Sequence, residues 1–147
     1  MSEPIWKFKL DRSKSFDLYD HVGHVKDGII MEGDLPVGFI LRDRLYIFAG
    51  YDWNGCNPKR RIFGKIVGTP DFKKTINASL AHDFLIEYYW QHNLNRKKID
   101  DVFEGILKLD GFKLWWLYSS VVHAFRFISS VTPITRREYR KKRKPRS

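Results

Sequence analysis

The chain has 147 residues and a formal net charge of +10, and 43% of its residues are hydrophobic. This length suits one domain that can bury a sizeable core. The single cysteine, Cys56, excludes an intrachain disulfide framework. No run approaches the roughly 20 apolar residues of a membrane span. The N-terminus lacks the pattern of a signal peptide, so we expect a cytoplasmic protein without a transmembrane segment.

Short strands are expected over residues 5–67. Residues 5–10 alternate apolar and polar side chains with period two, and short apolar runs follow at 28–31, 39–41, 44–49 and 61–67. Turn-forming Gly, Pro and Asp residues separate these runs. Connections of this length favour antiparallel strands or hairpins.

Three helices are expected over residues 77–130, at about 77–92, 96–109 and 112–130. Apolar residues recur at helical spacing in the second helix, which Asn95 would cap and Gly111 would end. Strands followed by helices predict an α+β fold. We therefore expect one α+β domain over residues 1–131 and a basic C-terminal tail over residues 132–147.

A histidine and a carboxylate stand side by side on the first predicted helix, at His82 and Asp83, and Asp100 stands on the second helix. Neutral histidine is the commonest general base near pH 7, and it works best when a carboxylate holds its far nitrogen. Neighbouring residues point about 100° apart on a helix, so Asp100 on an antiparallel helix is better placed than Asp83 to orient His82. Asp83 would then face a cation, and the loop around Asn54 and Gly55 would supply further oxygen ligands.

A structural role for the same residues stays open. On a mostly apolar helix, His82 would be a core histidine and Asp83 would form a cap or pair with a lysine. Spacing alone favours this structural role, so the choice depends on whether several segments fit one pattern together.

Three segments occur in a fixed order: the glycine loop Tyr51-Asp-Trp-Asn-Gly-Cys-Asn-Pro-Lys-Arg60, the element Ser79-Leu-Ala-His-Asp-Phe-Leu-Ile86, and the element Arg96-Lys-Lys-Ile-Asp-Asp-Val-Phe103. With the aromatic-rich helix that follows, they resemble a family of small phage and prophage proteins, domain of unknown function 1353. The resemblance covers residues 39–127. It implies a phage protein in the cytoplasm of the infected host or incorporated into the virion.

The same skeleton is similar to secreted and viral phospholipase A2 enzymes, in which a calcium loop precedes a His-Asp helix and a second helix supplies an orienting Asp. This likeness implies calcium as cofactor, with two catalytic residues and three calcium ligands: His82 and Asp100, then Asp83, Asn54 and Gly55. Two positions depart from the pattern, because Asn54 replaces the loop Asp and Ile86 replaces a Tyr. These departures favour a scaffold kept for its shape or a weakened calcium site, and they leave chemistry by His82 and Asp100 open.

The C-terminal tail concentrates the positive charge. Residues 136–147 hold eight Lys or Arg and one Glu, a net charge of +7 out of +10. Such an arm binds polyanions through counterion release, so its expected partners are nucleic acid, an anionic membrane surface or an acidic groove in another subunit. The candidate residues are Arg136, Arg137, Arg140, Lys141, Lys142, Arg143, Lys144 and Arg146.

Three functions stay open. The first, which the departures favour, is a structural or accessory phage protein that acts with other phage subunits through its aromatic helix and basic tail. The second is a calcium-assisted phospholipase or esterase that acts on host membrane lipid with His82 as base. The third is a non-specific nucleic-acid-binding module driven by the tail.

Overall fold

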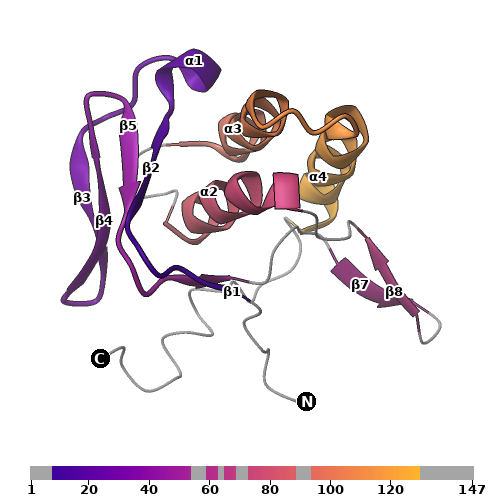
Figure 1. Ribbon diagram of the computed structural model, residues 1–147, viewed down its shortest axis with the longest axis horizontal. Helices are drawn as coiled ribbons and strands as arrows, with labels where there is room; N and C mark the ends of the chain where they lie inside the picture. The colour runs from indigo at the N-terminus through magenta and orange to yellow at the C-terminus, as the bar shows by residue number, and fades with distance from the viewer. Residues whose placement is uncertain (1–7, 54–58, 63–64, 69–72, 89–93, 130–147) are drawn as a thin grey trace.

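Antiparallel strands form the N-terminal part of the fold and helices form the C-terminal part (Figure 1). The computed structural model describes residues 8–53, 59–62, 65–68, 73–88 and 94–129. Its four-stranded sheet has the order β2-β5-β4-β3, built from Lys14–Asp17, Arg44–Ile47, Leu35–Leu41 and Gly28–Glu32. All neighbours in this sheet are antiparallel. The predicted α+β class is confirmed.

Two short ladders lie outside that sheet. β1 (Phe8–Lys9) pairs with β6 (Asp52–Trp53), and β7 (Lys59–Ile62) pairs with β8 (Lys65–Gly68). The prediction of one strand over residues 61–67 is wrong, because the two halves of this run pair with each other. Ile62 pairs with Lys65, and a two-residue connection is the length that hairpins prefer. Residues 52–53, expected in a loop, form β6.

The helical part begins with η1 (Lys73–Thr75) and continues with α2 (Ile76–Tyr88), α3 (Arg96–Leu109) and α4 (Trp115–Ser129), while the short α1 (Tyr19–Val22) follows β2. The predicted bounds of α3 are confirmed. The side chain of Asn95 accepts a hydrogen bond from the Lys98 backbone N–H at 2.8 Å, and Gly111 adopts a positive φ of 73° just past the helix end.

The start of α4 differs from the prediction, since the helix begins at Trp115 rather than at residue 112. The residues just before it close α3 instead. The Gly111 N–H donates to the Lys108 carbonyl and the Phe112 N–H donates to the Leu107 carbonyl, which is the pattern of a helix ending in a left-handed glycine. Phe112 is therefore bound to the end of α3 and is not free to begin the next helix.

The core lies between the sheet and the helices. In Figure 1 the sheet stands on one side, α2 and α3 lie beside it, and α4 lies on the far side. Phe84 of α2 contacts the sheet at Gly38 and stacks edge-on against Tyr51. Helix α2 is buried on almost every side, because it touches the sheet with one face and α3 with another. The buried aliphatic side chains of the sheet are Ile30, Val37, Ile40, Leu45 and Ile47.

Candidate functional site

The structure brings His82 of α2 and Asp100 of α3 into direct contact. The His82 Nε2 atom lies 2.8 Å from Asp100 Oδ1, and both residues are buried. A second hydrogen bond joins Asn77, near the start of α2, to Asp110, at the end of α3. Because the start of one helix meets the end of the other, α2 and α3 run in opposite directions, as the sequence predicted.

Local sequence explains why Asp100 faces inward. Asn95 fixes the first turn of α3, and Ile99 and Phe103, which flank Asp100 on the helix, belong to the buried core. The ring of Phe103 lies 5.1 Å from the His82 imidazole, centroid to centroid. The imidazole is therefore held by one hydrogen bond and one ring contact, both from α3.

This geometry suits the histidine to proton transfer. A carboxylate oxygen accepts hydrogen bonds, so a neutral His82 carries its proton on Nε2 and points it at Asp100. The lone pair then lies on Nδ1, which is the atom that would remove a proton from water. Asp100 thus fixes both the tautomer and the orientation of the ring.

Asp83 lies on the other side of the imidazole. Its Oδ1 atom is 4.0 Å from His82 Nδ1, which is beyond hydrogen-bond reach, and its side chain is buried. Asp83 therefore does not orient His82, as the angle between neighbouring helix residues predicted.

A second histidine, which the sequence interpretation did not include in the site, faces the same acid. His123 of α4 places its Nδ1 atom 3.7 Å from Asp100 Oδ2, while its Nε2 atom lies 3.9 Å from Asp101 Oδ1. The imidazoles of His82 and His123 thus lie beside opposite oxygens of one carboxylate. The sequence carries little signal for this position, because it depends on which side of α4 packs against α3.

Position 86, where the phospholipase pattern has a tyrosine, holds an isoleucine. Ile86 is half-buried and packs against the hydrophobic core, so it brings no hydroxyl to the carboxylates. Two buried tyrosines have acidic partners elsewhere, since Tyr88 donates to Glu32 at 3.2 Å and Tyr51 donates to Glu87 at 3.1 Å.

The described residues do not by themselves form a calcium site. Calcium takes six to eight oxygen ligands, and among residues 8–53, 59–62, 65–68, 73–88 and 94–129 no group of three His, Cys, Asp or Glu side chains is placed to hold a metal ion. Asp83 alone therefore does not make the site. Asn54 and Gly55 lie outside the described residues, so calcium binding stays a prediction.

The basic tail also lies outside the described residues, and its eight candidate polyanion contacts, from Arg136 to Arg146, stay predictions. Within the described chain, no helix combines the length and the apolar character that crossing a bilayer requires. Comparison of the chain with protein-family models, curated proteins and solved structures found no match. Function must therefore be argued from the residues around His82.

Proposed function

We propose that the protein is an ester hydrolase in which His82 is the general base and Asp100 is its orienting acid. The observation that carries this proposal is the 2.8 Å bond between His82 Nε2 and Asp100 Oδ1 across two antiparallel helices. A neutral imidazole has one donor and one acceptor nitrogen, and the hydrogen bond at Nε2 uses the donor. Here that bond comes from a buried carboxylate, and it leaves the second nitrogen available for chemistry.

In the proposed reaction a water molecule binds at His82 Nδ1 and attacks the ester carbonyl carbon. The water proton passes to Nδ1, and Asp100 stabilises the resulting imidazolium through Nε2. When the tetrahedral intermediate collapses, the bond to the leaving alkoxide breaks and Nδ1 returns the proton to that oxygen. One ester and one water give one carboxylic acid and one alcohol, and the enzyme ends in its starting protonation state.

The substrate class proposed from the resemblance is host membrane phospholipid, with calcium as cofactor. The assay is release of fatty acid from phosphatidylglycerol vesicles, measured with calcium and with chelator. His82→Ala should lower the rate by about 10²–10⁴, the usual contribution of a general base. Asp100→Asn keeps the shape of the side chain and should also lower the rate. The matched control is Asp101→Asn, because Asp101 is half-buried and pairs with Lys97 at 3.2 Å.

The hydrolase proposal fails if the parent protein releases no fatty acid from any vesicle at any calcium concentration. It also fails if His82→Ala keeps full activity in a protein that is folded by circular dichroism. An effect of calcium that survives Asp83→Asn would remove Asp83 from the cation site without touching the role of His82.

The second candidate is a structural or accessory phage subunit that acts in a larger assembly. The half-buried Ile86 favours it, since that position supplies packing where the phospholipase pattern has a hydroxyl. This candidate requires the protein to be present in purified virions at a fixed stoichiometry. Absence from particles, together with hydrolysis that depends on His82, would decide for the enzyme.

A further inference from the structure

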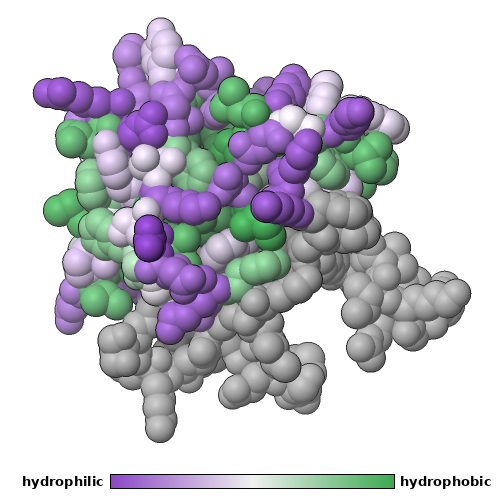
Figure 2. All heavy atoms as spheres, viewed as in Figure 1, coloured by the Kyte–Doolittle hydropathy of each residue, from purple (hydrophilic) through white to green (hydrophobic). Residues whose placement is uncertain are grey.

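Four large apolar side chains are exposed together where α3 ends and α4 begins. Their relative exposures are 74% for Leu109, 43% for Leu114, 54% for Trp116 and 42% for Leu117. We call these four residues the corner patch. Figure 2 shows green apolar atoms beside purple polar ones at the edge of the molecule where α4 lies. Clustered exposed apolar groups mark an interaction site more often than isolated ones do.

The fold itself turns these residues outward. Phe112 and Tyr118 occupy the inner side of the connection, where their rings meet edge to face at 4.8 Å and both are buried. Leu114 and Trp116–Leu117 stand between these two anchors in the sequence. Tyr118, Ser119 and Val122 fill the inner side of α4, and Trp116 and Leu117 lie off that side and are exposed.

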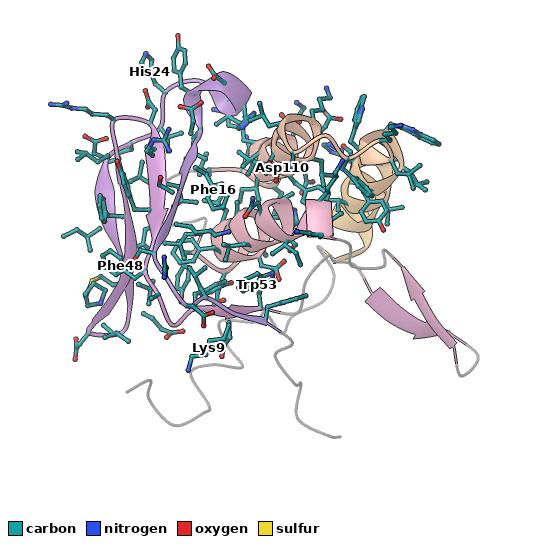
Figure 3. All side chains as sticks on the ribbon, in the orientation of Figure 1. Lys9, Phe16, His24, Phe48, Trp53 and Asp110 are labelled. Atoms are coloured by element: carbon teal, nitrogen blue, oxygen red, sulfur yellow. The ribbon has the colours of Figure 1, made fainter. Side chains whose placement is uncertain are left out.

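The border of the corner patch is positive. Lys74 places its ammonium 3.8 Å from the position of a Cβ built on Gly111, and Lys108 places its ammonium 4.2 Å above the Trp115 ring. Exposed Lys73 adjoins Lys74 in sequence, and exposed Lys113 lies between Phe112 and Leu114. Two acids lie nearby: Glu104, which pairs with Lys108 at 3.6 Å and accepts from Ser119, and Asp110, labelled in Figure 3, which accepts from Asn77.

Charge decides which partner fits this surface. A second copy of the chain would meet the corner patch through a two-fold axis, which brings the same patch of both copies into one interface. The four lysines of each copy would then share that interface, and gathering like charges in one interface is unfavourable. An anionic partner has no such penalty.

We propose that the corner patch is a docking site for the surface of an anionic lipid bilayer. Tryptophan and leucine suit the boundary between headgroups and acyl chains, and lysine side chains reach from an apolar surface to phosphate groups. The protein lies on the bilayer in this arrangement and does not cross it. The docking does not depend on the proposed hydrolysis, and it is separate from the basic tail.

The test is sedimentation of the full-length chain with vesicles of phosphatidylcholine alone and of phosphatidylcholine mixed with phosphatidylglycerol. The variant is Trp116→Ser combined with Leu117→Ser. The control is Ile29→Ser combined with Leu41→Ser, because Ile29 and Leu41 are apolar residues of the sheet that are at least as exposed as Leu117. Measurements at about 1 M salt, where charges are screened beyond roughly 3 Å, reduce the contribution of the tail, which is the same in both variants.

At about 0.1 M salt, where screening is weaker, the parent should bind the mixed vesicles more tightly than the neutral ones. At about 1 M salt the corner-patch variant should lose about tenfold or more in partition coefficient relative to the parent, while the control keeps it. Brominated acyl chains should quench tryptophan fluorescence in the parent, and Trp116→Phe should remove that quenching. Equal binding by the two double variants would overturn the proposal. Loss of self-association without any loss of lipid binding would assign the corner patch to a second copy and would also overturn it.

Vesicle binding and hydrolysis are separate readouts. If vesicles bind through the corner patch but no fatty acid is released, the docking inference stands and the hydrolase proposal falls. If His82-dependent hydrolysis proceeds on short-chain esters without vesicle binding, the reverse holds.

Discussion

Gly38 lies where the backbone of the sheet and helix α2 approach each other closely, so a substitution there should measure how much space the core leaves. It lies in the middle of β4, paired with Ile47 of β5. A Cβ atom at this position would lie 2.4 Å from the backbone oxygen of Tyr46 and 2.9 Å from Cζ of Phe84. Both distances are well inside ordinary van der Waals contact, so Gly38→Ala forces either the strand or the helix to shift.

The expected loss of stability follows from two opposing terms. Overpacking a tight core costs about 1–3 kcal/mol, while replacing glycine with alanine restricts the unfolded chain and returns about 0.4–1 kcal/mol. Because both contacts are shorter than real Cβ contacts, the upper part of that cost, about 2–3 kcal/mol, applies, and the net fall in the free energy of unfolding is about 1–2.6 kcal/mol. At roughly 4 °C per kcal/mol for a chain of this size, Tm should fall by about 4–10 °C.

Urea and thermal unfolding followed by circular dichroism would measure the change. Phe84→Leu, alone and combined with Gly38→Ala, completes a double-mutant cycle. The Tyr46 oxygen belongs to the backbone of the β4–β5 ladder, where Phe39 pairs with Tyr46, so a smaller side chain at position 84 should not restore the loss. An unchanged Tm for Gly38→Ala, or full recovery in the double variant, would show that the close contact with the backbone oxygen is not the cause.

Two further predictions concern polar contacts. The backbone N–H of Val25 holds the pKa of Asp43 below its ordinary value of 3.8, with a smaller contribution from His24. A carboxyl whose pKa is lowered by folding stabilises the fold fully at pH values above its unfolded pKa. This stabilisation is lost as the pH falls through the folded pKa. Asp43→Asn, which suits the left-handed backbone there, should therefore be less stable at pH 7, and its deficit should shrink below pH 3.8 in urea titrations. A deficit independent of pH would contradict this reasoning. Asn95→Ala removes the cap of α3 and should lower the free energy of unfolding by about 1 kcal/mol, whereas Asn95→Ser should keep most of it. Equal losses in the two variants would show that the loss does not come from the side-chain hydrogen bond to the Lys98 N–H.

Features set by local residues could be predicted from the sequence. The bounds of α3 were predicted because a capping Asn95 and a left-handed Gly111 mark its ends. Strand β2 was not predicted, because Lys14–Asp17 is mostly polar and lies at the edge of the sheet, where among the described strands only β5 pairs with it. Polar edge residues carry no apolar alternation for a pattern to detect.

In the candidate site, the contact between His82 and Asp100 could be predicted from the sequence and the position of His123 could not. His82 and Asp100 were matched because a short connection between two helices makes them antiparallel neighbours. The position of His123 depends on how α4 rotates against α3, which is decided by the packing of Phe112 and Tyr118 rather than by local periodicity. Contacts between helices that are fixed by side-chain packing leave little trace in one sequence.

The burial of α2 bears on how freely the chain can vary. Its backbone amides should exchange with deuterium only when the whole domain opens, because almost every side of this helix is covered. If His82 is the base of the proposed hydrolysis, it stands on a segment where selection for folding and selection for chemistry act on adjacent residues. A deep mutational scan should find α2 intolerant along its length, with most positions failing in protein abundance and position 82 failing in activity alone.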